Sequence, residues 1–246
     1  MGPASRFQGL ACRDERGRAG RGATTYRRPR GRVARRNGLN GHMLNWAPIL
    51  EAAQTVVAGC NAPEAARFLA GWPAPAAPRA VVPASAPVVA WLDAAARAAP
   101  AGPLGTLARR IAAAATALAW RQTYRPGDAT ASFLGRYGYC ELLGAVGPVP
   151  CTALAGGILL LGPDTHYPAH RHVAEELYVP LSGSAGWQRG DAPFALRQPG
   201  EAVFHASDEP HAMRTSDAPL LALYVWRGDG LAEPARLDPA TPGERP

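Results

Sequence analysis

Three histidines and one glutamate have the spacing of a metal-binding group. His170 and His172 are two residues apart, so on a β-strand both side chains project from one face while Arg171 projects from the other. Glu176 follows four residues after His172, and His211 comes after a Pro-Gly turn and a further strand-like run. Imidazole and carboxylate donors suit a divalent transition metal, and four protein ligands leave coordination positions open for water or substrate. This pattern predicts a metal site.

The predicted ligands lie within a stretch rich in strand-like runs. After the RPGD turn at 125–128 these runs are RYGYCELL, TALAGGILLL, ELYVPL, AGWQR, FALR, EAVFHA and LLALYVW, and signals such as GP, SG, GD and PG separate them. About seven short strands at close spacing predict a β-sandwich or a small barrel. We expect the barrel to span residues 125–231 and to be followed by a flexible, proline-rich tail at 232–246.

The chain before the strands has a helical pattern. Residues 43–124 are rich in alanine, which favours helix, and Leu104, Leu107, Ile111 and Leu118 fall on one helical face. Several prolines divide this half of the chain into short helices. The predicted fold class is therefore α+β, mainly β, with a helical N-terminal segment packed on or beside a β-barrel.

The positive charge is concentrated at the N-terminus. All 26 basic residues are arginine and the net charge is +7, but residues 1–42 hold 11 arginines and two acidic residues, which leaves −2 for the other 204 residues. This basic tail lacks apolar periodicity, so we expect it to be disordered. It is either an arm for nucleic acid or targeting, or a segment upstream of a start at Met43. We favour the second, because helical periodicity begins directly after Met43, and a nucleic-acid partner is therefore not expected.

Cysteine spacing and a long uncharged stretch limit the class of protein further. Cys12, Cys60, Cys140 and Cys151 show no paired spacing, so we expect neither a disulfide framework nor a zinc knuckle, and a reducing cytoplasm is the simplest compartment. Residues 142–163 carry no charge over 22 positions, but prolines and glycines inside the stretch would break a membrane-spanning helix. We expect two buried strands there and no membrane partner. The lack of lysine argues against Schiff-base chemistry and a P-loop.

The metal-binding pattern resembles the motifs of the cupin family. Its first motif, HxHxxxExxxxxxG, corresponds to His170, His172, Glu176 and Gly183. In the looser second motif a Pro-Gly pair is present, and His211 stands where the metal histidine belongs. The resemblance implies a double-stranded β-helix barrel, or jelly roll, with the metal in the barrel mouth. This fold agrees with the independent strand count.

A closer similarity narrows the family. The segments YPAHRHVAEELYVPLSG and PHAMRTSDAPLLALYVWRGD resemble cupin-type dimethylsulfoniopropionate lyases, in particular the longer members with a helical N-terminal segment. The resemblance covers roughly residues 43–231 in organisation and about 165–229 in motif detail. It implies a metal-dependent lyase that cleaves dimethylsulfoniopropionate to dimethyl sulfide and acrylate. One divalent transition metal ion is expected, and Fe, Mn, Zn, Co and Ni all suit the predicted ligands.

The resemblance also implies a tyrosine base for the elimination. The family's tyrosines correspond to Tyr167 and Tyr178, and Tyr178 has the strand parity of the metal-binding glutamate. A phenol has an unperturbed pKa near 10, which a nearby dication lowers. Both tyrosines stay candidates, since Tyr178 can also be a core aromatic and Tyr167 can position substrate. The sulfonium is a bulky cation that suits aromatic faces, and Trp226, Tyr224 and Trp187 are the candidates to bind it.

Two other functions fit the same residues. Another metal-dependent cupin enzyme, such as an isomerase or a dioxygenase, would keep the ligands, but the tyrosine pair supplies a base and no redox group. A non-catalytic cupin sensor would use the basic tail, although no helix-turn-helix pattern supports it. His166, His205 and Glu175 are left outside the predicted metal shell, and we expect Glu175 to be solvated or paired with an arginine. A homodimer is compatible with the family, because cupins often pair through barrel edges.

Overall fold

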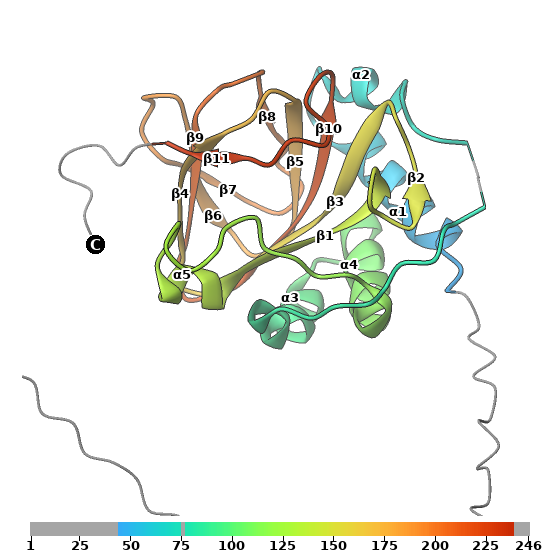
Figure 1. The fold of residues 1–246 in the computed structure, drawn as a ribbon, viewed down its shortest axis with the longest axis horizontal. Coiled ribbons are helices and arrows are strands. Elements are labelled where there is room, and N and C mark those ends of the chain that lie inside the picture. The colour runs from blue at the N-terminus through green and yellow to red at the C-terminus, as the bar shows by residue number, and fades with distance from the viewer. Residues whose placement is uncertain (1–43, 75–76, 239–246) are drawn as a thin grey trace, which may run out of the picture. The chain divides into compact units, whose positions relative to one another are not determined.

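The computed structural model describes residues 44–74 and 77–238, so the basic tail at 1–42 lies outside the described part of the chain. Helices come first in the chain, and strands follow them (Figure 1). The helices are α1 (Ala47–Gly59), α2 (Ala65–Leu69), the 3₁₀ turn η1 (Pro87–Trp91), α3 (Leu92–Ala98), α4 (Pro103–Ala113), the 3₁₀ turn η2 (Ala115–Ala117) and α5 (Ala131–Arg136).

The strands form two sheets with an interleaved order. They are β1 (Tyr137–Gly144), β2 (Val149–Pro150), β3 (Leu154–Leu161), β4 (His166–Arg171), β5 (Glu175–Ser182), β6 (Ala185–Arg189), β7 (Ala195–Arg197), β8 (Val203–His205), β9 (His211–Thr215), β10 (Leu220–Arg227) and β11 (Arg236–Leu237). One sheet has the order β2-β1-β3-β10-β5-β8 and the other β11-β4-β9-β6-β7. Successive strands alternate between the sheets along much of the chain, which makes a double-stranded β-helix. The predicted fold class, α+β and mainly β with a helical N-terminal segment, is confirmed.

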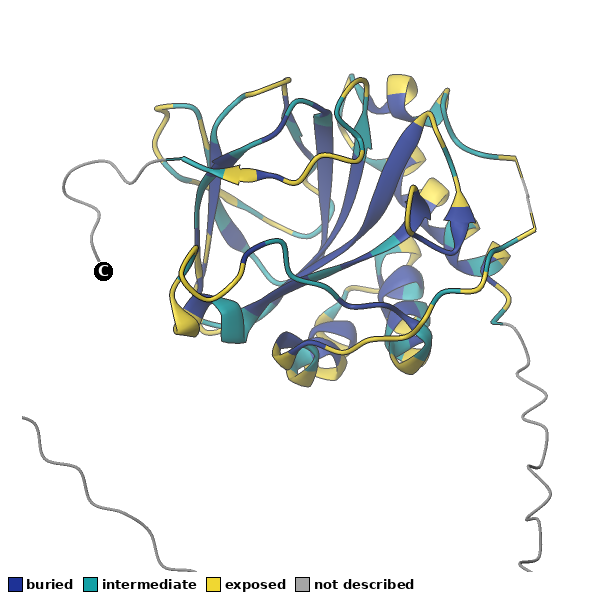
Figure 2. Ribbon diagram, in the orientation of Figure 1, coloured by how far each residue is buried: buried dark blue, intermediate teal, exposed yellow. Residues whose placement is uncertain are grey.

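The six-stranded sheet is buried on both faces. Helices α1 to α4 pack on its outer face, where their apolar side chains join the outward-facing residues of β1, β3, β5 and β10 (Figure 1). The inner face meets the second sheet around a separate aromatic-rich core. These strands are accordingly dark blue along most of their length, whereas exposed residues concentrate on loops and outer helix faces (Figure 2).

Strand β5 shows how one sequence serves both cores. Leu177, Val179 and Leu181 point outward and pack with the helices, while Tyr178 belongs to the core between the sheets. Glu176 has the parity of Tyr178 and is fully buried on the inner side. Because both faces are covered, the apolar sequence is nearly continuous, yet its alternate positions still decide which residues can reach the site.

The uncharged stretch at 142–163 is not a helix. It contains the end of β1, the short strand β2 and the whole of β3, and turns and short irregular segments join these strands. In the described residues no helix is long and apolar enough to cross a membrane. The three described cysteines, Cys60, Cys140 and Cys151, are free thiols, and Cys12 lies outside the described residues.

Two element boundaries differ from those expected from the sequence. Helix α4 ends at Ala113, and Leu118 has an extended backbone, so Leu118 does not continue the helical face. The residues that follow already join the barrel, because Arg121 forms an antiparallel bridge with Tyr139 of β1. The chain beyond 231 was expected to be a flexible tail. As far as Asp238 it has a defined structure instead, because β11 pairs with β4 of the barrel.

Candidate metal site and cavity

Three chain segments meet at one end of the barrel to bring the predicted ligands together. His170 is in β4 and lies opposite His211 of β9 in the antiparallel pair. His172 directly follows β4, and Glu176 is near the start of β5. All four side chains are buried, with at most 3% of any residue exposed.

Each histidine is oriented by a hydrogen bond on its outer nitrogen. The Nδ1 atoms of His170, His172 and His211 lie 2.9 Å from the backbone carbonyl oxygens of Pro168, Ala174 and Glu209, in that order. A carbonyl can only accept, so each Nδ1 carries the proton, and a neutral ring then has its lone pair on Nε2. Backbone carbonyls that fix the histidine tautomer in this way are typical of metal-binding histidines.

Glu176 is the centre of the group. Its Oε2 lies 2.9 Å from His172 Nε2 and 3.3 Å from His211 Nε2, while its Oε1 accepts a 2.7 Å hydrogen bond from Trp226 Nε1. Burial alone would raise the pKa of Glu176, but the two histidines hold that pKa well below its ordinary value. Glu176 is therefore an anion, and the group offers a buried negative charge beside two imidazoles.

The ligand atoms of His172, Glu176 and His211 lie within 4.8 Å of one another. His211 Nε2 is buried and makes no hydrogen bond within the described residues, so its lone pair is free to bind an ion. Two imidazole nitrogens and a carboxylate are a donor set that suits a divalent transition metal. This buried His-His-Glu group can therefore hold a metal ion.

His170 lies next to this group, although its ligand atoms are not among those that meet within 4.8 Å. Its ring packs 4.1 Å from that of His211 and stacks on Tyr167 at 3.8 Å, with the two planes almost parallel. Burial and the neighbouring His211 lower the pKa of His170 well below its ordinary value, so the ring is neutral. The sequence treated four ligands as equivalent, whereas the structure separates one of them from the other three.

A cavity of about 230 Å³ opens beside the His-His-Glu group. Most of the predicted site residues line it: Tyr167, His170, His172, Glu176, Tyr178, Tyr224 and Trp226. The Trp226 ring stacks on His172 with centroids 4.1 Å apart, which fixes it at the edge of the group. Tyr224 lies two residues before Trp226 on the same face of β10, with its ring 6.3 Å from that of Trp226.

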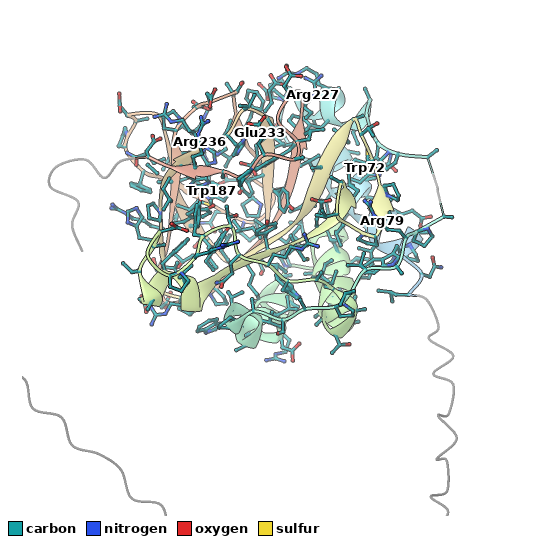
Figure 3. All side chains as sticks on the ribbon, viewed as in Figure 1. Trp72, Arg79, Trp187, Arg227, Glu233 and Arg236 are labelled. Atoms are coloured by element: carbon teal, nitrogen blue, oxygen red, sulfur yellow. The ribbon has the colours of Figure 1, made fainter. Side chains whose placement is uncertain are left out.

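Trp187, expected to bind the sulfonium, does not line the cavity. Trp187, labelled in Figure 3, is buried. Its ring lies 4.9 Å from that of Tyr178 and is stacked at 6.3 Å on that of His205. Strand β6 belongs to the sheet opposite Tyr178, so Trp187 fills the core behind that tyrosine. The sequence places Trp187 in a strand-like run, but it could not predict which strand residues border empty space.

The two candidate tyrosines have different surroundings. The Tyr167 hydroxyl lies 3.1 Å from the Tyr124 hydroxyl and 3.5 Å from that of Tyr137, in a cluster of phenols. Tyr178 lies two residues after Glu176 on the inner face of β5. Burial and the negative charge of Glu176 raise the pKa of Tyr178 well above its ordinary value. Its phenol is therefore protonated at neutral pH unless additional positive charge lies close by.

Several cavity residues were not predicted. Tyr137, Tyr139 and Glu141 share one face of β1, and their alternation in RYGYCELL was a readable signal. Arg121 and Thr123 reach the cavity from the helical segment, and residues 231–235 reach it from the chain between β10 and β11, where Figure 3 labels Glu233. No local pattern marks these last residues, because only the tertiary fold brings them to the cavity.

His205 and Glu175 were placed outside the metal shell by the sequence. His205 is fully buried and stacks on His211 with centroids 4.0 Å apart, and it is not part of the group that meets within 4.8 Å. Glu175 projects from the other face of β5 and forms ion pairs with Arg67 at 3.2 Å and Arg227 at 2.7 Å. The expected pairing of Glu175 with arginine is confirmed.

The fold and the buried His-His-Glu group together define a cupin able to bind metal. The sequence profile of the dimethylsulfoniopropionate lyase family matches residues 62–222, and the chain belongs to that family. It is 41% identical over 119 residues to the dimethylsulfoniopropionate lyase DddQ of Ruegeria pomeroyi, covering 48% of this chain and 59% of the relative. It is 33% identical over 129 residues to DddL of Cereibacter sphaeroides, covering 52% of this chain and 53% of the relative. The chain thus spans little more than half the length of these two relatives.

Solved structures agree with the family assignment. A chain from the crystal structures of the DMSP lyases RdDddP and RnDddQII superposes with a TM-score of 0.68 and 31% identity, over 79% of this chain and 97% of that chain. The crystal structure of the DMSP lyase DddQ from Ruegeria pomeroyi superposes with a TM-score of 0.63 and 33% identity, over 76% and 96%. The similarity therefore includes the helical segment as well as the barrel.

Proposed function

We propose that this protein is a metal-dependent carbon–sulfur lyase that cleaves dimethylsulfoniopropionate to dimethyl sulfide and acrylate. The observation that carries the proposal is the juxtaposition, in a chain of this family, of a buried His-His-Glu group and a cavity lined by tyrosines and a tryptophan. The substrate has a carboxylate at one end and a β-sulfonium leaving group at the other. A base at the α-carbon is the remaining requirement for elimination.

His172, Glu176 and His211 are the residues we assign to hold the metal, and His170, the other residue of the predicted set, is buried beside them as a supporting residue. A bound divalent cation supplies positive charge that offsets the charge developing on the substrate carboxylate and lowers the pKa of a nearby phenol. The buried, hydrogen-bonded surroundings of the ligands keep their nitrogens oriented before any ion arrives.

Tyr178 is our candidate for the base, because it lines the cavity two residues from Glu176 on the same strand face. Its phenolate would take the α-proton. The electron pair of that C–H bond would form the new double bond to the β-carbon, while the C–S bond breaks and its electron pair leaves on sulfur. The products are acrylate, dimethyl sulfide and protonated Tyr178, which returns its proton to water.

Tyr167 is better suited to positioning. Its ring is stacked on His170, and its hydroxyl is within hydrogen-bonding distance of Tyr124 and Tyr137, so it is held rigidly at the cavity wall. Trp226 and Tyr224 supply the aromatic faces against which the sulfonium would lie. Trp226 is also tied to Glu176 through its indole N–H, which holds the ring in place.

We further propose a cytoplasmic location, supported by the free thiols at Cys60, Cys140 and Cys151. No disulfide joins the described cysteines, as is usual for proteins in a reducing compartment.

The test of the proposed activity is direct. Purified protein is incubated with dimethylsulfoniopropionate, and dimethyl sulfide in the headspace and acrylate in solution are both quantified. We expect equal amounts of the two products, loss of turnover after treatment with a chelator, and recovery when a divalent metal is restored. Absence of dimethyl sulfide from a folded, metal-loaded protein would exclude this activity and would favour another metal-dependent cupin reaction.

A further inference from the structure

Arg121 brings a guanidinium to the cavity from outside the two sheets. The backbone N–H of Arg121 donates to the carbonyl of Tyr139 at 2.7 Å, and the N–H of Tyr139 donates back at 3.0 Å. Residues directly opposite each other in an antiparallel pair project to the same side. Tyr139 lines the cavity, and Arg121 accordingly lines it as well, from beyond the outer edge of β1.

The guanidinium of Arg121 is without a partner within residues 44–74 and 77–238. It makes no hydrogen bond, ion pair or ring contact there, although the residue is only partly exposed. Many other described arginines are neutralised by carboxylates: Arg67 and Arg227 by Glu175, Arg171 by Asp238, Arg189 by Glu209 and Arg236 by Asp208. Arg121 is also the only arginine among the described residues that line the cavity.

The carboxylates of the cavity do not neutralise this charge. Glu141 accepts hydrogen bonds of 2.7 Å from the backbone N–H groups of Val146 and Gly147, which close the turn after β1. Glu176 is bound to the histidines and Trp226. Glu233 lies on the exposed segment after β10 and forms no ion pair with Arg121. A half-buried charge that the protein itself leaves unpaired is stabilised when an anion binds.

We propose that Arg121 is the carboxylate-recognising residue of this cavity. A guanidinium presents a planar fork of donors that matches the two oxygens of a carboxylate, and it stays charged throughout the physiological pH range. The ligand class is a small monocarboxylate that fits a cavity of about 230 Å³. Its identification with the dimethylsulfoniopropionate carboxylate and the acrylate product rests on the proposed function, whereas the recognition of a carboxylate by Arg121 does not.

The experiment measures equilibrium binding instead of turnover. The full chain is titrated with propionate and with propionamide, which has the same shape but no charge, by calorimetry or by nuclear magnetic resonance. The variants are R121Q, R121K and the control R125Q, whose arginine is exposed and does not line the cavity. All proteins are compared at equal metal content, so that any difference in binding comes from the arginine.

We expect wild type and R125Q to bind propionate better than propionamide, and R121Q to bind propionate about 10- to 100-fold more weakly, as for the loss of a charge-assisted hydrogen bond. R121K should lie between the two, because a lysine keeps the charge but not the fork. If R121Q does not melt cooperatively, R121M, which keeps the aliphatic part of the side chain, takes its place.

Two results would overturn the inference: equal affinity of wild type for propionate and propionamide, or propionate binding that is unchanged in R121Q. The outcome is separable from that of the proposed function. Arginine-dependent propionate binding without any dimethyl sulfide production would leave the inference standing and reject the lyase activity. Dimethyl sulfide production with arginine-independent propionate binding would reject the inference alone.

Discussion

The hydrogen bond on the outer nitrogen of each site histidine decides what its inner nitrogen can do. In His170, His172 and His211 the Nδ1 proton is engaged by a backbone carbonyl, so in the neutral ring Nε2 is left as the acceptor. Each carbonyl stands two residues away from its histidine along the chain; Pro168 lies within β4, whereas Ala174 and Glu209 lie in loops. Local backbone geometry thus selects the tautomer that a metal needs.

Single histidine substitutions should distinguish the three convergent residues from the neighbouring His170 by their effect on metal affinity. We expect H172A to lose metal affinity by more than the 10- to 100-fold loss typical of residues that only support a ligand, because His172 is one of the three residues whose donors converge. H170A should stay within that range, since its donors lie outside the group. Metal content and competition titrations measure both. Equal losses in the two variants would restore His170 to equal standing with the other ligands.

Replacing Tyr178 by phenylalanine tests the base. Y178F keeps the ring in the core between the sheets but removes the ionisable oxygen, so metal content should be unchanged while kcat falls by roughly 10²–10⁴. The same loss should affect kcat/KM, because the interaction is made only in the transition state. Steady-state kinetics of dimethyl sulfide release give both constants.

Y167F is the matched control for Y178F. It should raise KM more than it lowers kcat, since Tyr167 is held among other phenols at the cavity wall. The reverse result, with Y178F close to wild type and Y167F inactive, would assign the base to Tyr167.

At the scale of elements, the glycine that closes the first motif has a steric role. Gly183 lies between β5 and β6 with φ of +73°, and a Cβ added there would be 2.2 Å from the carbonyl oxygen of Pro219. The turn therefore needs both a left-handed backbone and the absence of a side chain. It lets β5, which carries Glu176 and Tyr178, run beside β10, which carries Trp226.

We expect G183A to lower the free energy of unfolding by about 2–5 kcal/mol, from the left-handed conformation together with the steric overlap. G190A is the control, because Gly190 also has a positive φ of +50° but has no atom within 4 Å of an added Cβ. Its cost should be only about 1–2 kcal/mol. Urea denaturation of both variants measures the difference, and equal destabilisation would show that the contact with Pro219 relaxes without cost.

Strand β4 shows a limit of parity arguments. Tyr167 and His170 are three positions apart and would face opposite sides of a regular strand. They are nevertheless stacked at 3.8 Å, because the register of β4 against β9 shifts between them. An irregularity of this kind re-aims a side chain, as bulges near functional sites commonly do. The inward position of Tyr167 therefore depends on pairing with β9, which no local pattern reveals.

At the scale of the whole molecule, the described residues form two hydrophobic cores with different roles. The core between helices and sheet covers the outer face of the six-stranded sheet, and the core between the sheets supports the site. Among the described residues, the buried members of the first core begin at Trp46 and those of the second begin at Tyr124. The helices therefore belong to the stable body and are not an appendage.

A chain that begins at Met43 should consequently fold and retain activity. We expect its melting temperature and kcat to match those of the full chain, because every core residue of the described part is kept. Thermal unfolding and dimethyl sulfide release from the two proteins provide the comparison. A clear loss of either property would show that residues 1–42 contribute, and would revive a binding or targeting role for the basic tail.

The sequence by itself determined the features that depend on local spacing. Short strand-like runs at close spacing predicted the barrel, and the first motif pointed to His170, His172, Glu176 and Gly183, which lie in or next to β4 and β5. Proline and glycine in the uncharged stretch predicted strands in place of a membrane helix. These signals are readable because the repeat of a strand and the conformational limits of proline and glycine act over only a few residues.

The tertiary structure alone decided which inward-facing residues meet at the cavity. It placed Trp187 behind Tyr178, separated His170 from the three convergent ligands, and brought Arg121 in from the chain before the barrel. It also ordered the chain after β10 by pairing β11 with β4. These outcomes depend on contacts between segments far apart in the sequence, and on where packed side chains leave space, which periodicity within one strand does not encode.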